Sequence, residues 1–192
     1  VDHNLRKDSY LEARFVESFC TSISVNHKIL IWEGVKPYSG IQEKARKQRY
    51  NLILNQCIQE KIFILFTAHH ADDIAETMAY RILSKSNIYG LDPIKNVRKI
   101  RGIAIARPLL SVSKEKILVT LKNYNLNFKI DPSNKDTSYT RVKMRNLLSQ
   151  NLKLKKDLVK SSKIYSKVRF FIDHYIWKEF NKFCSLEPEG YI

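Results

Sequence analysis

The chain has 192 residues, 44% hydrophobic and 28% charged, a balance that excludes a disordered protein. Its 34 lysines and arginines outnumber 19 aspartates and glutamates, and the net charge of +15 favours a nucleic-acid partner. No apolar run is long enough to cross a membrane, and the three separated cysteines, Cys20, Cys57 and Cys184, favour a reducing cytoplasm over a disulfide framework.

In chain order, the first half predicts strands alternating with helices. A helix should run from Ser9 to about Thr21, a strand over residues 27–32, a helix over 41–59 and a strand over 62–66. A further helix should then begin in a His/Asp-rich segment and end near Ser84. This alternation predicts βαβ units and a parallel sheet with right-handed crossovers.

The second half is expected to become progressively more helical. Ser113 should cap a helix through Asn123, residues 128–130 should form a short strand, and another helix should cover about 138–149. From residue 152 the chain is lysine-rich and helical. We therefore expect an α/β domain over residues 1–150, a Rossmann-like parallel sheet with flanking helices, followed by a helical C-terminal extension over residues 151–192.

The most informative segment is residues 67–77, which reads Thr-Ala-His-His-Ala-Asp-Asp-Ile-Ala-Glu-Thr directly after an apolar strand. His70 and Asp73 share one face of the predicted helix, while Asp72 and Glu76 share the neighbouring face. In open α/β sheets, ligands bind where strands end. The segment therefore predicts a site able to hold a metal ion, a phosphate or a proton.

Four further clusters lie where predicted strands end or loops return. Residues 1–6 read Val-Asp-His-Asn-Leu-Arg. Glu43 lies three residues before Arg46, which lies four before Tyr50, so the three share one helix face. Arg107 precedes a proline at the end of an apolar segment, where its planar fork suits a phosphate or carboxylate. A turn at residues 131–136 leads into a helix that carries Arg141 and Arg145.

These five blocks, in this order, resemble the tRNA(Ile)-lysidine synthetase family over residues 1 to about 150. The resemblance implies an adenine nucleotide α-hydrolase fold of the PP-loop type. It implies an ATP-dependent ligase that adenylates C2 of the wobble cytidine in a CAU-anticodon isoleucine tRNA. The amine of free L-lysine then displaces AMP and forms lysidine. ATP and Mg²⁺ are the implied cofactors, and tRNA(Ile) is the implied macromolecular partner.

The resemblance also implies roles for single residues. The catalytic candidates are Asp2, His70, Asp73 and Arg107. The nucleotide-binding candidates are His3, His70, Asp73 and Arg107, with Asp73 as the metal ligand. Substrate contacts are expected from Glu43, Arg46, Asp72, Asp136, Arg141 and Arg145. Asp2, Glu43, Asp72 and Asp136 all stay open as the carboxylate that holds the lysine.

Two departures from the family pattern change the expectation for activity. The nucleotide loop Ser-Gly-Gly-x-Asp-Ser is absent from the 192 residues, so we expect an N-terminally truncated fragment that is inactive alone. Residues 85–87 read Lys-Ser-Asn where the family has Gly-Ser-Gly, which reduces the backbone freedom of that loop. A homodimer is one expectation for the oligomeric state.

Three alternatives stay open. One is a PP-loop enzyme of the 2-thiocytidine type, although the Cys-x-x-Cys pair of that type is missing before the helix at residue 41. Another is a two-metal phosphohydrolase that uses His69, His70, Asp72 and Asp73. The last is a tRNA-binding remnant without catalysis. Lysines after residue 152 would track tRNA phosphate or form the solvated face of a linker helix.

Overall fold

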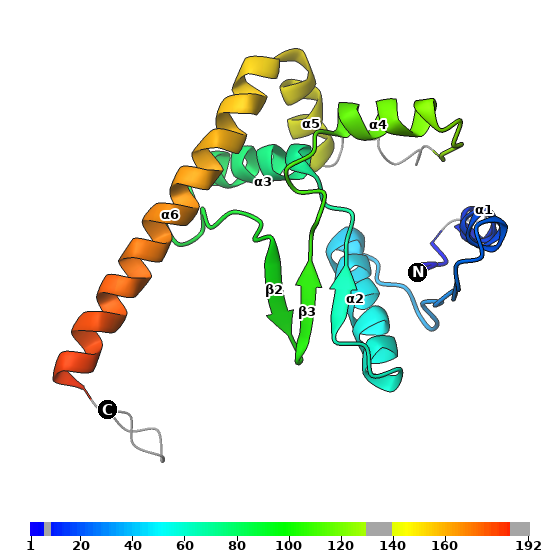
Figure 1. The fold of residues 1–192 in the computed structure, drawn as a ribbon, viewed down its shortest axis with the longest axis horizontal. Helices are drawn as coiled ribbons and strands as arrows, with labels where there is room; N and C mark the ends of the chain where they lie inside the picture. The colour runs from blue at the N-terminus through cyan, green and yellow to red at the C-terminus, as the bar shows by residue number, and fades with distance from the viewer. Residues whose placement is uncertain (6–8, 130–139, 185–192) are drawn as a thin grey trace. The chain divides into compact units, whose positions relative to one another are not determined.

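The computed structural model describes residues 1–5, 9–129 and 140–184. The chain forms two compact units, drawn in Figure 1. The first comprises residues 1–67 and 97–106, and the second comprises residues 68–96 and 107–192. Each unit is described by itself.

The first unit contains a three-stranded sheet in the order β1-β3-β2. The strands are β1 (Ile64–Phe66), β2 (Val97–Ile100) and β3 (Ile103–Ala106). Strands β1 and β3 pair in parallel, with Leu65 opposite Ile105. Strands β2 and β3 pair antiparallel, with Val97 opposite Ala106. The predicted α/β class with flanking helices and a helical C-terminal part is confirmed, but the sheet is mixed where a parallel one was expected.

The antiparallel pair follows from the length of its connection. Only Arg101 and Gly102 separate β2 from β3, and both have positive φ angles, 51° and 82°. Two such residues match the tight turn that best suits the twist of a hairpin. A parallel neighbour would need a crossover of a dozen residues or more, so β3 returns beside β2 in the opposite direction.

Helix α2 (Ile41–Gln59) covers the sheet of the first unit, as Figure 1 shows. Leu54 and Cys57 of α2 pack with Ile103 and Ile105 of β3, all of them buried. Burial of Cys57 raises the pKa of its thiol, so this cysteine belongs to the core. Helix α1 (Ser9–Ser22) lies in the same unit and contributes no buried residue.

Two predicted strands are wrong in the described part of the chain. Of residues 27–32, Ile31 alone forms a bridge, in parallel with Asp2. There the Asp2 N–H donates to the carbonyl of Leu30, and the Trp32 N–H donates to that of Asp2, each at 2.8 Å. A single bridged residue is too short to count as a strand. Residues 128 and 129 form no strand, and residue 130 lies outside the described ranges.

The second unit is helical within its described residues. It contains α3 (Ala71–Leu83), α4 (Lys114–Asn123), α5 (Thr140–Gln150) and α6 (Leu152–Phe183). Helices α5 and α6 pack against α3 through a core in which Met78 and Leu148 are almost fully buried. The predicted cap is confirmed, because Ser113 Oγ accepts the Lys116 N–H at 3.3 Å. Asn151 caps α6 in the same way, accepting the Leu154 N–H at 3.0 Å.

Helix α6 continues well past its contacts with α3 and α5, as Figure 1 shows. Its buried residues are Leu158 and Ser162, while Phe170, Phe171 and Trp177 are 67%, 67% and 56% exposed. No helix in the described ranges combines the length and the apolar character that a membrane span needs.

Candidate functional site

The start of α3 is fixed by its own side chains and by a returning loop. Asp73 Oδ2 accepts the backbone N–H of His70 at 2.9 Å, which satisfies the residue that precedes the helix. The Ala71 N–H donates to the carbonyl of Val112 at 2.9 Å. Loop 107–112 is therefore held against the first turn of α3, the turn that carries the predicted His/Asp cluster.

His70 and Asp73 lie together as the helical spacing predicted. His70 Nδ1 is 3.7 Å from Asp73 Oδ2, beyond hydrogen-bond distance, and their side chains are 19% and 17% exposed. His70 Nδ1 is buried and has no hydrogen-bond partner among the described residues. A buried ring nitrogen without a partner is costly unless something binds there, so this atom is a candidate contact for a further group.

Asp72 holds two donors on the neighbouring side of the first turn. Its Oδ1 accepts the Lys114 N–H at 3.0 Å, and its Oδ2 pairs with Lys155 Nζ at 2.7 Å. Burial works to raise the pKa of the Asp72 carboxyl, but the hydrogen bonds from Lys155 and Lys114 outweigh it and hold the pKa below its ordinary value. The carboxylate is therefore ionised at neutral pH and already binds an ammonium group.

Glu76 forms a buried pair with Arg145 of α5. The carboxylate is only 3% exposed, and Arg145 meets it with two nitrogens, Nε to Oε1 at 2.8 Å and Nη2 to Oε2 at 3.2 Å. The hydrogen bond to Glu76 raises the pKa of the Arg145 guanidinium. A two-pronged contact of this kind fixes both position and orientation, so it ties α5 to α3.

Arg107 is buried at the start of the loop that reaches α3. Its Nη1 donates to the carbonyl of Lys95 at 2.7 Å, and its backbone N–H donates to the carbonyl of Asn96 at 2.8 Å. Its Nε is buried without a hydrogen-bond partner in the described part of the chain. A buried guanidinium with an unused donor has the chemistry to bind an anion, and this role of Arg107 stays a prediction.

Two predicted residues lie at the N-terminal end of the first unit. Asp2 is 6% exposed, and its Oδ1 accepts the Asn4 N–H at 2.8 Å. His3 Nε2 accepts a hydrogen bond from Arg49 Nε at 3.1 Å, and its ring stands edge-on to Trp32. Burial, together with the positive charge of Arg49, lowers the pKa of His3, so its imidazole is neutral at pH 7.

The other predicted substrate contacts are more exposed. On α2, the guanidinium of Arg46 lies over the ring of Tyr50, 5.5 Å from its centre, and Glu43 is exposed. On α5, Arg141 is exposed. Asp136 lies outside the described residues, as does the rest of the predicted turn at 131–136.

The second unit thus brings together His70, Asp72, Asp73 and the loop that begins at Arg107, while Asp2, His3, Glu43 and Arg46 belong to the first unit. No group of three His, Cys, Asp or Glu side chains placed to hold a metal ion occurs within residues 1–5, 9–129 and 140–184. The donor chemistry of Asp73 nevertheless suits Mg²⁺, which is commonly held by one or two carboxylates together with phosphate and water oxygens.

The sequence of residues 1–152 matches the PP-loop domain, a family of ATP-binding domains. The chain belongs to the PP-loop domain family. The match begins at the first residue and ends at the start of α6, so it includes every predicted site residue, from Asp2 to Arg145.

Several curated relatives of this PP-loop domain share one name. The protein called tRNA(Ile)-lysidine synthase from Bradyrhizobium diazoefficiens is 39% identical over 150 residues, which is 78% of this chain and 42% of the relative. The protein of the same name from Orientia tsutsugamushi is 37% identical over 152 residues, 79% of this chain and 34% of the relative. The chain therefore spans less than half the length of these relatives.

A solved structure has a similar fold. The U34-tRNA thiolase NcsA from Methanococcus maripaludis superposes with a TM-score of 0.66 at 15% identity, covering 86% of this chain and 59% of that one. The superposition supports a shared fold. At 15% sequence identity it carries no inference about the reaction.

Sequence reasoning on the PP-loop domain missed the partners of its acidic residues. Lys155 lies 83 residues from Asp72, and Arg145 lies 69 residues from Glu76. No local spacing reveals such pairs. Glu76 itself carried a signal, because it lies four residues after Asp72 on the face now covered by α5 and α6.

Proposed function

We propose that the chain is the PP-loop domain of an enzyme that ligates L-lysine to C2 of the wobble cytidine in a CAU-anticodon tRNA(Ile), forming lysidine. The observation that carries the proposal is the 39% identity over 150 residues to a protein named tRNA(Ile)-lysidine synthase. The chain spans 42% of that relative, so substrates, partners and reaction are all part of the proposal.

Hydrogen-bond donors and a carboxylate of the second unit suit the binding of ATP and Mg²⁺. Arg107 offers a buried Nε and His70 a buried Nδ1, each without a hydrogen-bond partner in the described ranges. Arg107 would neutralise charge on phosphate oxygens, and His70 would contact a phosphate or the base. Asp73 would hold Mg²⁺ through a carboxylate that the His70 N–H keeps in place. ATP, when bound, supplies the AMP group that activates the cytidine.

The carboxylate that holds the lysine substrate stays open among Asp2, Glu43, Asp72 and Asp136. Asp72 has the required chemistry, because it already binds the ammonium of Lys155 at 2.7 Å. Asp2 is buried and engaged with the Asn4 N–H, whereas Glu43 is exposed on α2. In the first unit, the neutral imidazole of His3 would be a nucleotide contact.

Positive charge on the second unit supports tRNA as the partner. On α6, a basic stripe of five exposed lysines follows the helical repeat with steps of three and four residues, on the side away from buried Leu158: Lys153, Lys156, Lys160, Lys163 and Lys167. None pairs with a carboxylate in the described part of the chain. The stripe extends for about 21 Å, and such a row suits successive phosphates of a folded RNA. Arg46, Arg141 and Arg145 are further proposed RNA or nucleotide contacts.

The test is incorporation of radiolabelled lysine into a CAU-anticodon tRNA(Ile) transcript with ATP and Mg²⁺. We expect incorporation when a segment with the family's Ser-Gly-Gly-x-Asp-Ser loop precedes residue 1, and none from the 192-residue chain. A transcript with a UAU anticodon is the control, because it lacks the cytidine. No incorporation with the added segment would overturn the proposal. Incorporation of labelled sulfur instead of labelled lysine would favour the 2-thiocytidine reaction.

A cytoplasmic location and a homodimer stay predictions. Cell fractionation measures the first and light scattering measures the second.

A further inference from the structure

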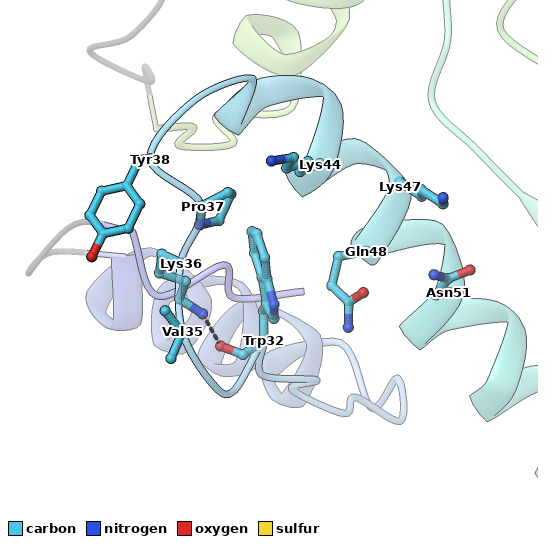
Figure 2. Close-up of a pocket in the computed structure, with 9 residues that line it drawn as sticks. All are labelled: Trp32, Val35, Lys36, Pro37, Tyr38, Lys44, Lys47, Gln48 and Asn51. Atoms are coloured by element: carbon cyan, nitrogen blue, oxygen red, sulfur yellow. Dashed lines mark hydrogen bonds between the residues drawn. The ribbon is translucent and has the colours of Figure 1, made fainter.

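A pocket of about 460 Å³ lies in the first unit, between the loop at residues 32–38 and the N-terminal half of α2. Figure 2 shows its lining residues. The volume falls within the range of about 300–1,000 Å³ that is usual for small-molecule sites. Of the candidate nucleotide and lysine contacts that the structure describes, none lines it.

The indole of Trp32 is held in place on one side of this pocket. The ammonium of Lys36 lies 4.3 Å from the centre of the Trp32 ring and also donates to the Trp32 carbonyl. The ring of His3 meets the indole edge-on, with ring centres 6.1 Å apart. In Figure 2 the indole stands between Lys36 and the side chain of Gln48. Trp32 therefore offers a rigid aromatic surface toward α2.

The opposite wall supplies cations and amides. Lys44 and Lys47 are exposed one helical turn apart on α2, and neither pairs with a carboxylate within the described ranges. Gln48 and Asn51 follow on the same helix, and Asn51 Oδ1 already accepts a hydrogen bond from Arg101. Among the described residues, no aspartate or glutamate lines the pocket. The pocket thus combines an aromatic platform, hydrogen-bonding amides and unneutralised positive charge.

We propose that this pocket receives one unstacked base of single-stranded RNA, with the flanking phosphates on Lys44 and Lys47. Bases splayed from loops are recognised by stacking on aromatic rings and by hydrogen bonds to their edges, with cations along the backbone. The inference rests on the proposed function, which makes a tRNA the substrate. A strand fits better than a free nucleotide because Lys44 and Lys47, although both line the pocket, are exposed and point in different directions in Figure 2, so they suit separate phosphates.

The two tryptophans of the chain, Trp32 and Trp177, allow a direct test. In Trp177→Phe, the only indole is that of the pocket, and a short single-stranded oligoribonucleotide should quench its fluorescence by stacking. Adding Lys44→Gln and Lys47→Gln should raise the dissociation constant about tenfold and lower the salt slope of binding by about two. The control substitution is Lys28→Gln, in the same unit, because Lys28 faces Glu60 and lies outside the pocket.

The outcomes separate this inference from the proposed function. Quenching by AMP at the same concentration as the oligoribonucleotide would overturn the RNA proposal in favour of a free nucleotide. If tRNA shifts the chain in a gel while Trp32 fluorescence stays constant, the pocket proposal is wrong and the tRNA partner stands. If neither the oligoribonucleotide nor tRNA binds, both the pocket proposal and the proposed tRNA partner are wrong. Unchanged affinity of the lysine variant, with an unchanged circular dichroism spectrum, would also contradict the proposal.

Discussion

Lys155 Nζ, in the first turn of α6, lies 2.7 Å from Oδ2 of Asp72, in the first turn of α3. The two side chains are 22% and 15% exposed, so the pair is partly withdrawn from water. Since Lys114 donates its backbone N–H to the other carboxylate oxygen, Asp72 joins the starts of three helices, α3, α4 and α6. The pair therefore positions the His/Asp cluster within the second unit.

Lys155→Met should lower the free energy of unfolding by about 1–3 kcal/mol, the range for hydrogen bonds to charged groups and for a polar group left unpaired. The reason is that Asp72 keeps only the Lys114 N–H as a donor. The pKa of Asp72 is lower in the folded chain than its ordinary value of about 4, so folding favours the ionised form. This stabilisation is complete above about pH 5 and disappears as the pH falls through the folded pKa.

Urea unfolding of the wild type and of Asp72→Asn at several pH values measures this contribution. The difference between them should be constant from pH 5 to 7 and should shrink below about pH 4. Lys156→Met, at the neighbouring exposed lysine, is the matched control and should change the unfolding free energy by less than about 0.5 kcal/mol. A difference that grows at acid pH would contradict the assignment.

Glu76→Gln should be more destabilising than Lys155→Met. The substitution removes the charge from a carboxylate that is 3% exposed and that pairs with Arg145 at 2.8 Å. Breaking a buried pair costs about 3–5 kcal/mol, and a third of the Arg145 side chain is exposed, so we expect about 3 kcal/mol. A double-mutant cycle with Arg145→Gln, by urea unfolding, is the measurement. Additive effects would show that the two groups do not interact.

Much of the second unit could be predicted from sequence, because its helices depend on local signals. Ser113 is a good N-cap, and α4 begins at the next residue. The His/Asp cluster begins α3 as predicted, since Asp73 caps the helix through the His70 N–H. Ile74 and Met78, four residues apart on α3, lie in its buried core, as apolar residues at helical spacing commonly do.

The sheet was less predictable, because pairing depends on residues far apart in the chain. Residues 27–32 have the composition of a strand, yet only Ile31 finds a partner among the described residues. Residues 97–100 read Val-Arg-Lys-Ile, and their polar character hid strand β2. The useful signal was Arg101-Gly102, a pair suited to a two-residue turn between extended segments.

Substitutions in that turn should change stability in opposite directions. Gly102 has a φ of +82°, where a side chain is strained, and nothing lies within 4 Å of an added Cβ. Gly102→Ala should therefore lower the unfolding free energy by about 1–2 kcal/mol through backbone strain alone. Arg101→Asn should cost nothing or stabilise slightly, because asparagine suits a positive φ in this turn, whereas the hydrogen bonds that are lost, from Arg101 to Asn51 and Asn55, are exposed and contribute little. Thermal unfolding of both variants measures these changes in stability. An unchanged stability of Gly102→Ala would show that the turn adopts another backbone conformation without cost.

The basic stripe of α6 makes a prediction about salt. If its lysines neutralise tRNA phosphates, the logarithm of affinity falls linearly with the logarithm of salt concentration, because bound counterions are released. Lys156→Gln with Lys160→Gln should reduce the magnitude of that slope by about two and weaken binding of all tRNA sequences alike. Both side chains are exposed, on the side of α6 away from Leu158, so the fold should be unaffected.

Filter binding of tRNA at several salt concentrations measures the slope, with Lys182→Gln as the control on the same helix. Lys182 pairs with Glu179 at 2.7 Å, so its charge is already compensated and its loss should leave the slope unchanged. Equal slopes for the double variant and the wild type would assign the stripe to a solvated helix face. A loss confined to one tRNA sequence would instead indicate base recognition, because phosphate contacts do not distinguish sequences.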